Sequence, residues 1–129
     1  MNASTVKLAE TEWTLMNCLW EQSPKTGREL IDELGRKVGW SRSTTLTLLT
    51  RLEAKGAIRV DTSGKVKAYS PTISREEAAI KETTSLIDRI YQGSLSTLVS
   101  TLTKRQSLSQ KEINELHAIL NELEAKTDD

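Results

Sequence analysis

A change in hydrophobic period near residue 57 is the feature that most limits what this chain can fold into. Before it, apolar residues recur every three or four positions, which predicts three amphipathic helices at about residues 10–22, 26–38 and 41–55. After it, apolar and polar residues alternate in two short runs around a Thr-Ser-Gly turn, which predicts a β-hairpin. Three helices followed by a hairpin is the order of a winged helix-turn-helix, so we expect a mainly α fold of that kind.

Residues at the expected helix ends support these boundaries. Thr26 and Glu29 have the spacing of a capping box, in which each side chain accepts a hydrogen bond from the other's backbone N–H. Gly39 suits the end of the second helix and Ser41 the N-cap of the third, whereas Ala9 cannot cap the first helix with its side chain. The helical residues expected to face inward are Trp13, Met16, Leu19, Trp20, Leu30, Ile31, Leu34, Val38, Thr45, Leu48, Leu49 and Leu52. The alternating residues of the hairpin strands are Ile58, Val60, Val66, Ala68 and Ser70.

From Ser74 onward the pattern is helical again. Capping boxes open helices at Ser74 and Ser109, and Gly93 separates the first helix from a short one. The apolar stripes of this arm cannot form much core alone, so a second copy of the arm is the simplest partner, and packing onto the chain's own winged helix is the alternative. We therefore divide the chain into a winged-helix domain, residues 1–72, and a helical dimerisation domain, residues 73–129. The predicted dimerisation residues are Leu95, Leu98, Val99, Leu102, Ile113, Leu116, Leu120 and Leu123.

The charges are unevenly distributed, although the net charge of the chain is zero. Residues 1–72 contain 11 Lys and Arg against 8 Asp and Glu, and residues 73–129 contain 7 against 10. A locally basic surface on a neutral protein suits the binding of phosphates, although a solvated surface would show the same charges.

The third predicted helix is the candidate DNA-reading element. Opposite its inward face it carries hydroxyl, apolar and guanidinium side chains, which suit base edges, thymine methyl groups and phosphates respectively. Lysines near the tip of the hairpin suit neighbouring phosphates, or they protect the strand edge. The predicted DNA-binding residues are Arg42, Ser43, Thr44, Leu46, Thr47, Thr50, Arg51, Lys65 and Lys67.

The sequence offers little for catalysis. His117 is the single histidine and is far in sequence from Cys18, the single cysteine, which we expect to pack as a small apolar residue. There is no glycine-rich phosphate loop and no paired metal-ligand motif, so we expect no enzyme, no metal site and no cofactor. The apolar runs are too short to span a bilayer and no signal peptide opens the chain, so we expect a cytoplasmic protein without membrane association.

Over about residues 8–124 the chain resembles the BlaI/MecI/CopY family of penicillinase and methicillin-resistance repressors and their copper-responsive relatives. The resemblance rests on Glu12-Trp13 with Leu19-Trp20, on TTLTLLTRLEAKG from Thr44 to Gly56, on Ala68-Tyr69-Ser70-Pro71, and on Tyr91-Gln92-Gly93-Ser94. The copper-responsive branch ends in a cysteine cluster, which this chain does not have after Cys18.

The resemblance implies a homodimer that binds a palindromic operator in double-stranded DNA and represses transcription, often of β-lactamase genes. It implies base contacts for Ser43, Thr44 and Leu46, with phosphate support from Arg51. In the drug-resistance branch, induction is by cleavage of the arm, ordered by a membrane sensor metallopeptidase, and the matching bond here is Thr101–Leu102. The family more often has a basic residue at position 46 and valine or isoleucine at position 45, so the operator sequence does not carry over.

Two other functions are compatible with the same pattern. A winged helix also serves as a protein-interaction module that binds no DNA. It also serves in regulators that bind a small molecule between arm and wing, although the few aromatic residues give no sign of such a pocket.

Overall fold

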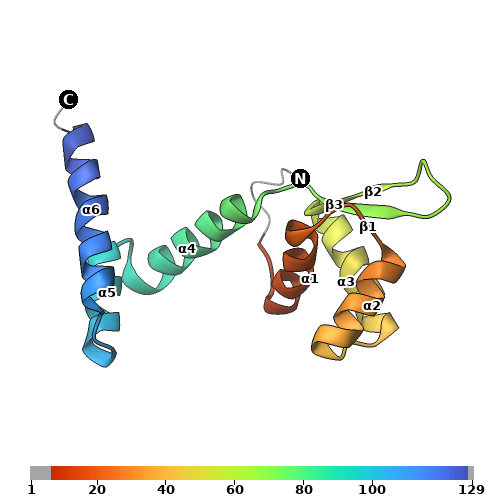
Figure 1. The fold of residues 1–129 in the computed structure, drawn as a ribbon, viewed down its shortest axis with the longest axis horizontal. Helices are drawn as coiled ribbons and strands as arrows, with labels where there is room; N and C mark the ends of the chain where they lie inside the picture. The colour runs from red at the N-terminus through yellow and green to blue at the C-terminus, as the bar shows by residue number, and fades with distance from the viewer. Residues whose placement is uncertain (1–6, 128–129) are drawn as a thin grey trace. The chain divides into compact units, whose positions relative to one another are not determined.

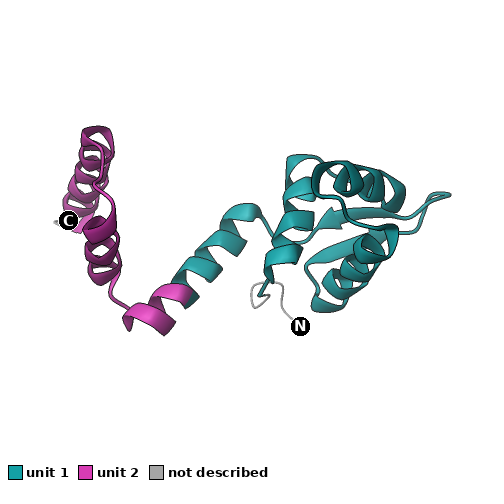
Figure 2. Ribbon diagram, turned by 90° about the horizontal axis from the view of Figure 1, so that it is seen from below, with its two compact units in different colours: residues 1–85 teal, residues 86–129 magenta. Residues whose placement is uncertain are grey.

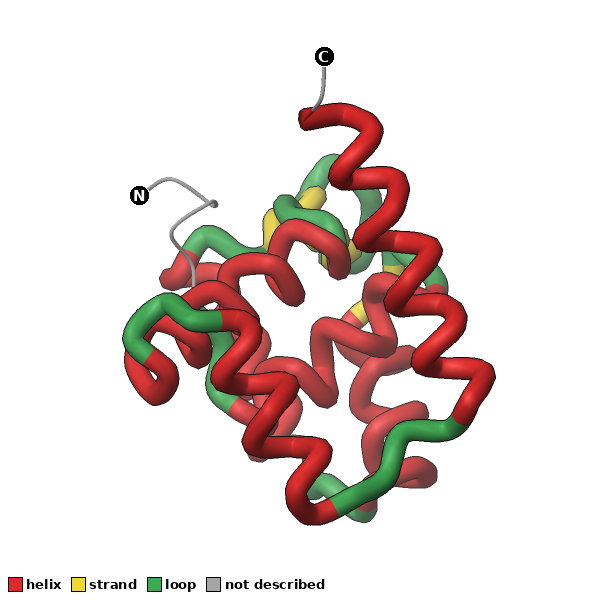
Figure 3. Tube along the Cα trace, turned by 90° about the vertical axis from the view of Figure 1, so that its left-hand side faces the viewer, coloured by secondary structure: helices red, strands yellow, loops and turns green. Residues whose placement is uncertain are grey.

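A computed structural model describes residues 7–127, which form six helices and three short strands (Figure 1). The helices and the two hairpin strands follow one another in the predicted order. Helices account for most of the described chain (Figure 3), so the fold is mainly α, as predicted. The elements are α1 (Glu10–Glu21), β1 (Lys25–Thr26), α2 (Gly27–Val38), α3 (Arg42–Lys55), β2 (Ile58–Asp61), β3 (Ala68–Pro71), α4 (Arg75–Tyr91), α5 (Leu95–Arg105) and α6 (Gln110–Thr127).

By its packing the chain divides into two compact units, residues 1–85 and 86–129 (Figure 2). The division falls after the predicted boundary at residue 72. The physical reason is Ala78 in the first turns of α4, which is buried as part of the core of the first unit. The start of α4 therefore packs with the winged helix.

The first unit is a winged helix with a small antiparallel sheet of order β1-β3-β2. The hairpin of β2 and β3 pairs Ile58 with Pro71 and Asp61 with Ala68. β1 adds a third strand that the sequence analysis did not predict, because two residues are too few to show an alternating pattern. The sheet therefore ties the segment before α2 to the wing.

The core of this unit is aliphatic and lies among α1, α2, α3 and the sheet. Leu15, Met16, Leu30, Leu34 and Leu52 are all essentially inaccessible to solvent. Tryptophans lie around the core rather than in it. Trp13 and Trp20 pack with ring centroids 5.5 Å apart, and the indole Nε1 of Trp20 donates to the Ile73 carbonyl oxygen at 2.9 Å.

The predicted helix ends are present. Thr26 Oγ1 accepts a hydrogen bond from Glu29 N at 3.1 Å, and Glu29 Oε1 accepts one from Thr26 N at 2.9 Å. The backbone N–H of Thr26, followed by the Thr26 side-chain hydroxyl, lowers the pKa of the Glu29 carboxyl. Gly39 and Gly56 end α2 and α3 in the left-handed region, at φ 72° and 82°, where a side chain would add strain.

One expected core position, Val38, and one expected strand position, Val66, were wrong. Val38 is 47% exposed, because it lies in the last turn of α2, beyond Leu34 and past the edge of the core. Val66 is 64% exposed and lies in the loop of the wing, because β3 begins only at Ala68. The Ala9 position lacks a side-chain cap, but its backbone N–H donates to Glu12 Oε1 at 2.7 Å, which is half of a capping box.

The second unit contains the end of α4 and all of α5 and α6. Gly93, at φ 84°, separates α4 from α5, and Ser94 and Ser109 cap the two following helices, with Oγ accepting from Thr97 N and Glu112 N. Neither α5 nor α6 has a buried residue. These two helices therefore lack a core of their own within the described chain.

Candidate nucleic-acid interface

Helix α3 has one buried face and one exposed face, as the sequence analysis predicted. Thr45, Leu48, Leu49 and Leu52 are buried, and Leu46 is 37% exposed. All seven α3 residues that were predicted to bind DNA are exposed to solvent, namely Arg42, Ser43, Thr44, Leu46, Thr47, Thr50 and Arg51. The helix therefore exposes hydroxyl and guanidinium groups to solvent, while its leucines pack in the core on the opposite face.

Polar contacts fix α3 at both ends. At its start, Ser41 Oγ accepts from Thr44 N at 3.2 Å and lies 3.0 Å from Thr44 Oγ1. At its end, Lys55 Nζ lies 2.5 Å from Glu12 Oε1 and donates to the Lys7 carbonyl oxygen at 3.0 Å. The second set of contacts was missed by the sequence analysis. It matters because it joins the last turn of α3 to the segment around the start of α1.

The wing has its own local order. Asp61 at the end of β2 accepts hydrogen bonds from Ser63 Oγ at 2.6 Å and from Ser63 N at 2.9 Å, and these bonds lower the pKa of the Asp61 carboxyl. The bonds form a turn of the Asx type at the start of the loop. Lys65 and Lys67 follow in the loop and are exposed, as is Arg59 on β2. Three cations therefore lie on or near the wing.

An open hollow of about 300 Å³ lies beside the exposed face of α3. Four of the predicted DNA-binding residues and a core residue line it, together with Thr11 from the first turn of α1. The sequence analysis did not single out Thr11, because a hydroxyl at the start of a helix gives no signal of its own. The lining residues are Thr11, Ser43, Thr44, Thr47, Leu48 and Arg51.

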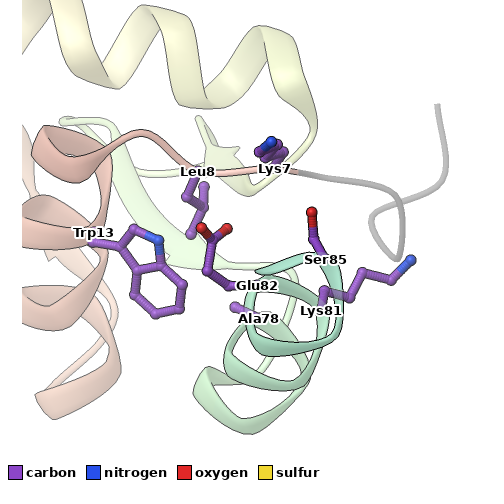
Figure 4. Close-up of a pocket in the computed structure, with 7 residues that line it drawn as sticks. All are labelled: Lys7, Leu8, Trp13, Ala78, Lys81, Glu82 and Ser85. Atoms are coloured by element: carbon purple, nitrogen blue, oxygen red, sulfur yellow. The ribbon is translucent and has the colours of Figure 1, made fainter. Parts of the chain in front are cut away.

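A second cavity, of about 220 Å³, lies between α1, the segment before it and the first half of α4 (Figure 4). Leu8 and Ala78 are its buried apolar members, and Trp13 presents its indole beside them. Lys7, Lys81, Glu82 and Ser85 complete the lining. The sequence analysis saw no sign of such a cavity, because its residues come from segments that are distant in sequence.

The apolar residues predicted to form a dimer seam are mostly exposed in the second unit. On α5, Leu95 and Leu102 are 60% and 59% exposed, and on α6, Leu120 is 55% exposed. Leu116, Leu123 and Val99 are exposed as well, whereas Leu98 and Ile113 are half-buried. The Thr101–Leu102 bond lies inside α5, and Thr101 Oγ1 donates to the Thr97 carbonyl oxygen at 2.8 Å.

The single cysteine is buried in the first unit. Burial, followed by the neighbouring Glu33 carboxylate, raises the pKa of the Cys18 thiol to about 11. Glu33 itself pairs with Lys25 Nζ at 2.5 Å and with Lys37 Nζ at 2.9 Å, and these two bonds lower its pKa to about 2. A thiol with a raised pKa is a poor nucleophile at neutral pH.

Across residues 7–127, no three histidine, cysteine, aspartate or glutamate side chains come together in a way that could hold a metal ion. Among the helices of the same range, none is both long enough and apolar enough to cross a bilayer.

Comparison with known proteins places this arrangement in a family. The family model described as "Penicillinase repressor" matches residues 8–122. The methicillin resistance regulatory protein MecI of Staphylococcus aureus (strain N315) is 31% identical over 121 residues, which are 94% of this chain and 98% of MecI. The penicillinase repressor of Bacillus licheniformis is 34% identical over 116 residues, which are 90% of this chain and 91% of the repressor.

A solved structure covers the winged helix. The monomeric form of Bacillus licheniformis BlaI in complex with the blaP half-operator is 32% identical to this chain, with a TM-score of 0.51. The match spans 56% of this chain and 88% of the BlaI chain. With a family model that matches nearly the whole sequence and relatives above 30% identity, this chain belongs to the penicillinase repressor family.

Proposed function

We propose that this chain is a DNA-binding transcriptional repressor that acts in the cytoplasm and reads double-stranded DNA with α3 and the wing. The observation that carries the proposal is the exposed face of α3, where Arg42 and Arg51 flank hydroxyl side chains and Leu46. Hydroxyl and methyl groups suit base edges in the major groove, and guanidinium groups suit phosphates. A related winged helix solved with a half-operator supports the same use of the fold.

The proposed active form is a homodimer on a palindromic operator. Two recognition helices then occupy successive major grooves, ~34 Å apart. The exposed apolar residues of α5 and α6 support this form, because two helices without buried residues gain stability by packing against a second copy. The names of the relatives favour genes of antibiotic response, such as β-lactamase genes, as targets.

Induction by cleavage at Thr101–Leu102, on the order of a membrane sensor metallopeptidase, is also part of the proposal. Because this bond lies inside α5, a protease needs the helix to unwind locally before it can bind the chain as an extended strand. Cleavage is therefore expected to be faster in a monomeric arm than in a paired one.

Binding of the full-length protein to a random-sequence duplex, measured by fluorescence anisotropy over a range of salt concentrations, tests the proposal. If about eight phosphates are contacted per dimer, log affinity falls with log salt at a slope of about −7. Selection of bound fragments from random DNA then gives the operator, whose two halves are expected to be inverted repeats. Absence of binding at low salt would leave the alternative of a protein-interaction module and overturn the proposal.

The cavity of Figure 4 favours a second candidate, a repressor whose DNA binding responds to a small molecule. The cavity combines the buried side chains of Leu8 and Ala78 and the indole of Trp13 with charged groups, and ligand pockets also combine apolar and polar groups. A shift in the melting temperature of the protein with a panel of small metabolites tests this idea. No shift with the parent, or the same shift with a Trp13→Ala variant, counts against it.

A further inference from the structure

We infer that the hollow between α1 and α3 receives a phosphate of the DNA backbone and that Thr11 of α1 is one of its ligands. The inference rests on the proposed function and deepens it, because it extends the DNA contact from α3 to a helix that the sequence analysis treated as core. Its basis is a single juxtaposition. The hydroxyl-bearing residue Thr11 and the guanidinium-bearing Arg51, 40 positions later, line the same open hollow.

The chemistry of the lining suits a phosphate diester. Thr11 supplies a hydroxyl group, and Arg51 supplies a planar guanidinium that can bind two oxygens of one phosphate. Ser43, Thr44 and Thr47 line the hollow from α3, so a phosphate held there lies next to the side chains proposed to face the bases. No carboxylate lines the hollow, and Leu48 is its one apolar member. Contacts to DNA phosphates from hydroxyl side chains and arginine fix the position of a protein on the duplex without reading sequence.

Two neighbouring acidic residues need to be considered, since both belong to the first turn of α1. The carboxylate of Glu12 is fully buried and paired with Lys55, so it does not face the hollow. Glu10 is exposed, but it is not part of the lining. Thr11 lies between them at the second position of the helix, where the free backbone N–H groups also favour an anion.

The position of Thr11 allows a test in which stability and DNA binding move in opposite directions. A carboxylate in the first turn of a helix stabilises that helix, so Thr11→Glu is expected to raise or preserve the melting temperature of the protein. The same carboxylate beside a DNA phosphate repels it. Loss of binding by Thr11→Glu therefore cannot be ascribed to unfolding.

The experiment measures affinity for a random duplex and for the selected operator by fluorescence anisotropy at about 0.1 M salt. We expect Thr11→Glu to weaken both by about five- to tenfold, and Thr11→Lys to strengthen both and to steepen the salt slope by about 0.9 per added phosphate contact. Thr83→Glu, an identical change at an exposed position of α4, is the control and is expected to bind as the parent does.

A double variant of Thr11 and Arg51 tests whether the two residues contact the same phosphate. If Thr11 and Arg51 bind one phosphate, the losses caused by Thr11→Ala and Arg51→Ala are not additive, and the double variant loses less than the product of the two fold-changes. Parent-like binding by Thr11→Glu, or additive losses in the double variant, overturns the inference while the proposed function stands. If the parent binds no duplex at all, the proposed function itself fails.

Discussion

The ammonium nitrogen of Lys55 lies 2.5 Å from the Oε1 atom of Glu12, and the two residues join the end of α3 to the start of α1. The Glu12 side chain is completely inaccessible to solvent, whereas that of Lys55 is 34% exposed. The same carboxylate oxygen accepts the backbone N–H of Ala9. A buried carboxylate with one cation partner depends on that partner, because an unpaired buried charge is costly.

Replacement of Lys55 by alanine is therefore expected to destabilise the protein by about 3 kcal/mol, since Glu12 is left buried without its cation. Urea unfolding followed by circular dichroism measures the change. Replacement of both residues, as Glu12→Leu with Lys55→Met, is expected to cost clearly less than the single change at Lys55. A double variant as unstable as the single one would show that the pair contributes through packing and not through its charges.

For Thr45 we predict a substitution that raises the stability of the protein, in contrast to the loss expected for Lys55. Its side chain is fully buried in α3, and its Oγ1 atom has no hydrogen-bond partner among the described residues. Thr45→Val keeps the shape and removes the unsatisfied hydroxyl, so we expect it to stabilise the protein by about 1 kcal/mol. Thermal unfolding measures the gain. A loss of stability would mean that the hydroxyl has a partner, such as a buried water molecule.

The exposed face of α3 predicts two different kinds of binding defect. Arg51→Ala is expected to weaken binding to every duplex by about five- to tenfold, because it removes a phosphate contact. Leu46→Ala is instead expected to change the preference among operator variants by about 1 kcal/mol, because position 46 faces base edges in the proposed complex. Anisotropy titrations with operator, single-base variants and random DNA separate the two effects. Similar changes of preference for both variants would contradict this placement of α3.

Glu33 makes the stability depend on pH. Its pKa is lowered from 4.5 to about 2 by hydrogen bonds from Lys25 and then from Lys37. A folded-state pKa below the unfolded value stabilises the protein above about pH 4.5, and this contribution is lost as the pH falls toward 2. Glu33→Gln is expected to cost about 2 kcal/mol at pH 7. Urea unfolding of parent and variant at several pH values measures the effect, and the difference between the two midpoints is expected to shrink as the pH falls toward 2. A difference that stays constant would rule out this linkage.

The proposed dimer seam predicts a selective loss of association. Leu120 is 55% exposed on α6, so Leu120→Lys is expected to disturb little packing within the chain. We expect it to shift the protein toward monomer in sedimentation velocity and to weaken operator binding, while unit 1 keeps its melting temperature. Ala118→Lys, on the side of α6 opposite Ile113, Leu116, Leu120 and Leu123, is the matched control. An unchanged sedimentation coefficient for Leu120→Lys would place the seam elsewhere.

The sequence alone predicted the positions of the helices and which face of α3 is buried and which is exposed. Their boundaries follow from local signals, such as the capping box of Thr26 and Glu29 and the glycines at 39 and 56. The burial of Thr45 and the exposure of Leu46 followed from the helical period alone. Such features were predictable because each is set by residues within one or two turns of one another.

What the sequence did not reveal depends on contacts between distant segments. The pairing of Glu12 with Lys55 and the hollow shared by Thr11 and Arg51 both join residues about 40 positions apart. β1 was missed because its two residues show no alternating pattern of their own, and Lys25 becomes a strand residue only by pairing with the distant Tyr69. Val38 was predicted to face the core and Val66 to lie in a strand, because both are apolar and fit the period, but Val38 lies at the end of α2 and Val66 in the loop before β3.

Because α5 and α6 have no buried residue, the proposed dimer makes operator occupancy depend steeply on the concentration of the protein. Under the proposed pairing, the amount of assembled protein rises with the square of the supply of free chains when these are scarce. A modest fall in synthesis of the protein, or cleavage of a small fraction of the chains, would then lower the dimer concentration, and with it operator occupancy, by a larger factor than the total protein concentration. The switch from silent to expressed genes would be sharper than the change in protein level that causes it.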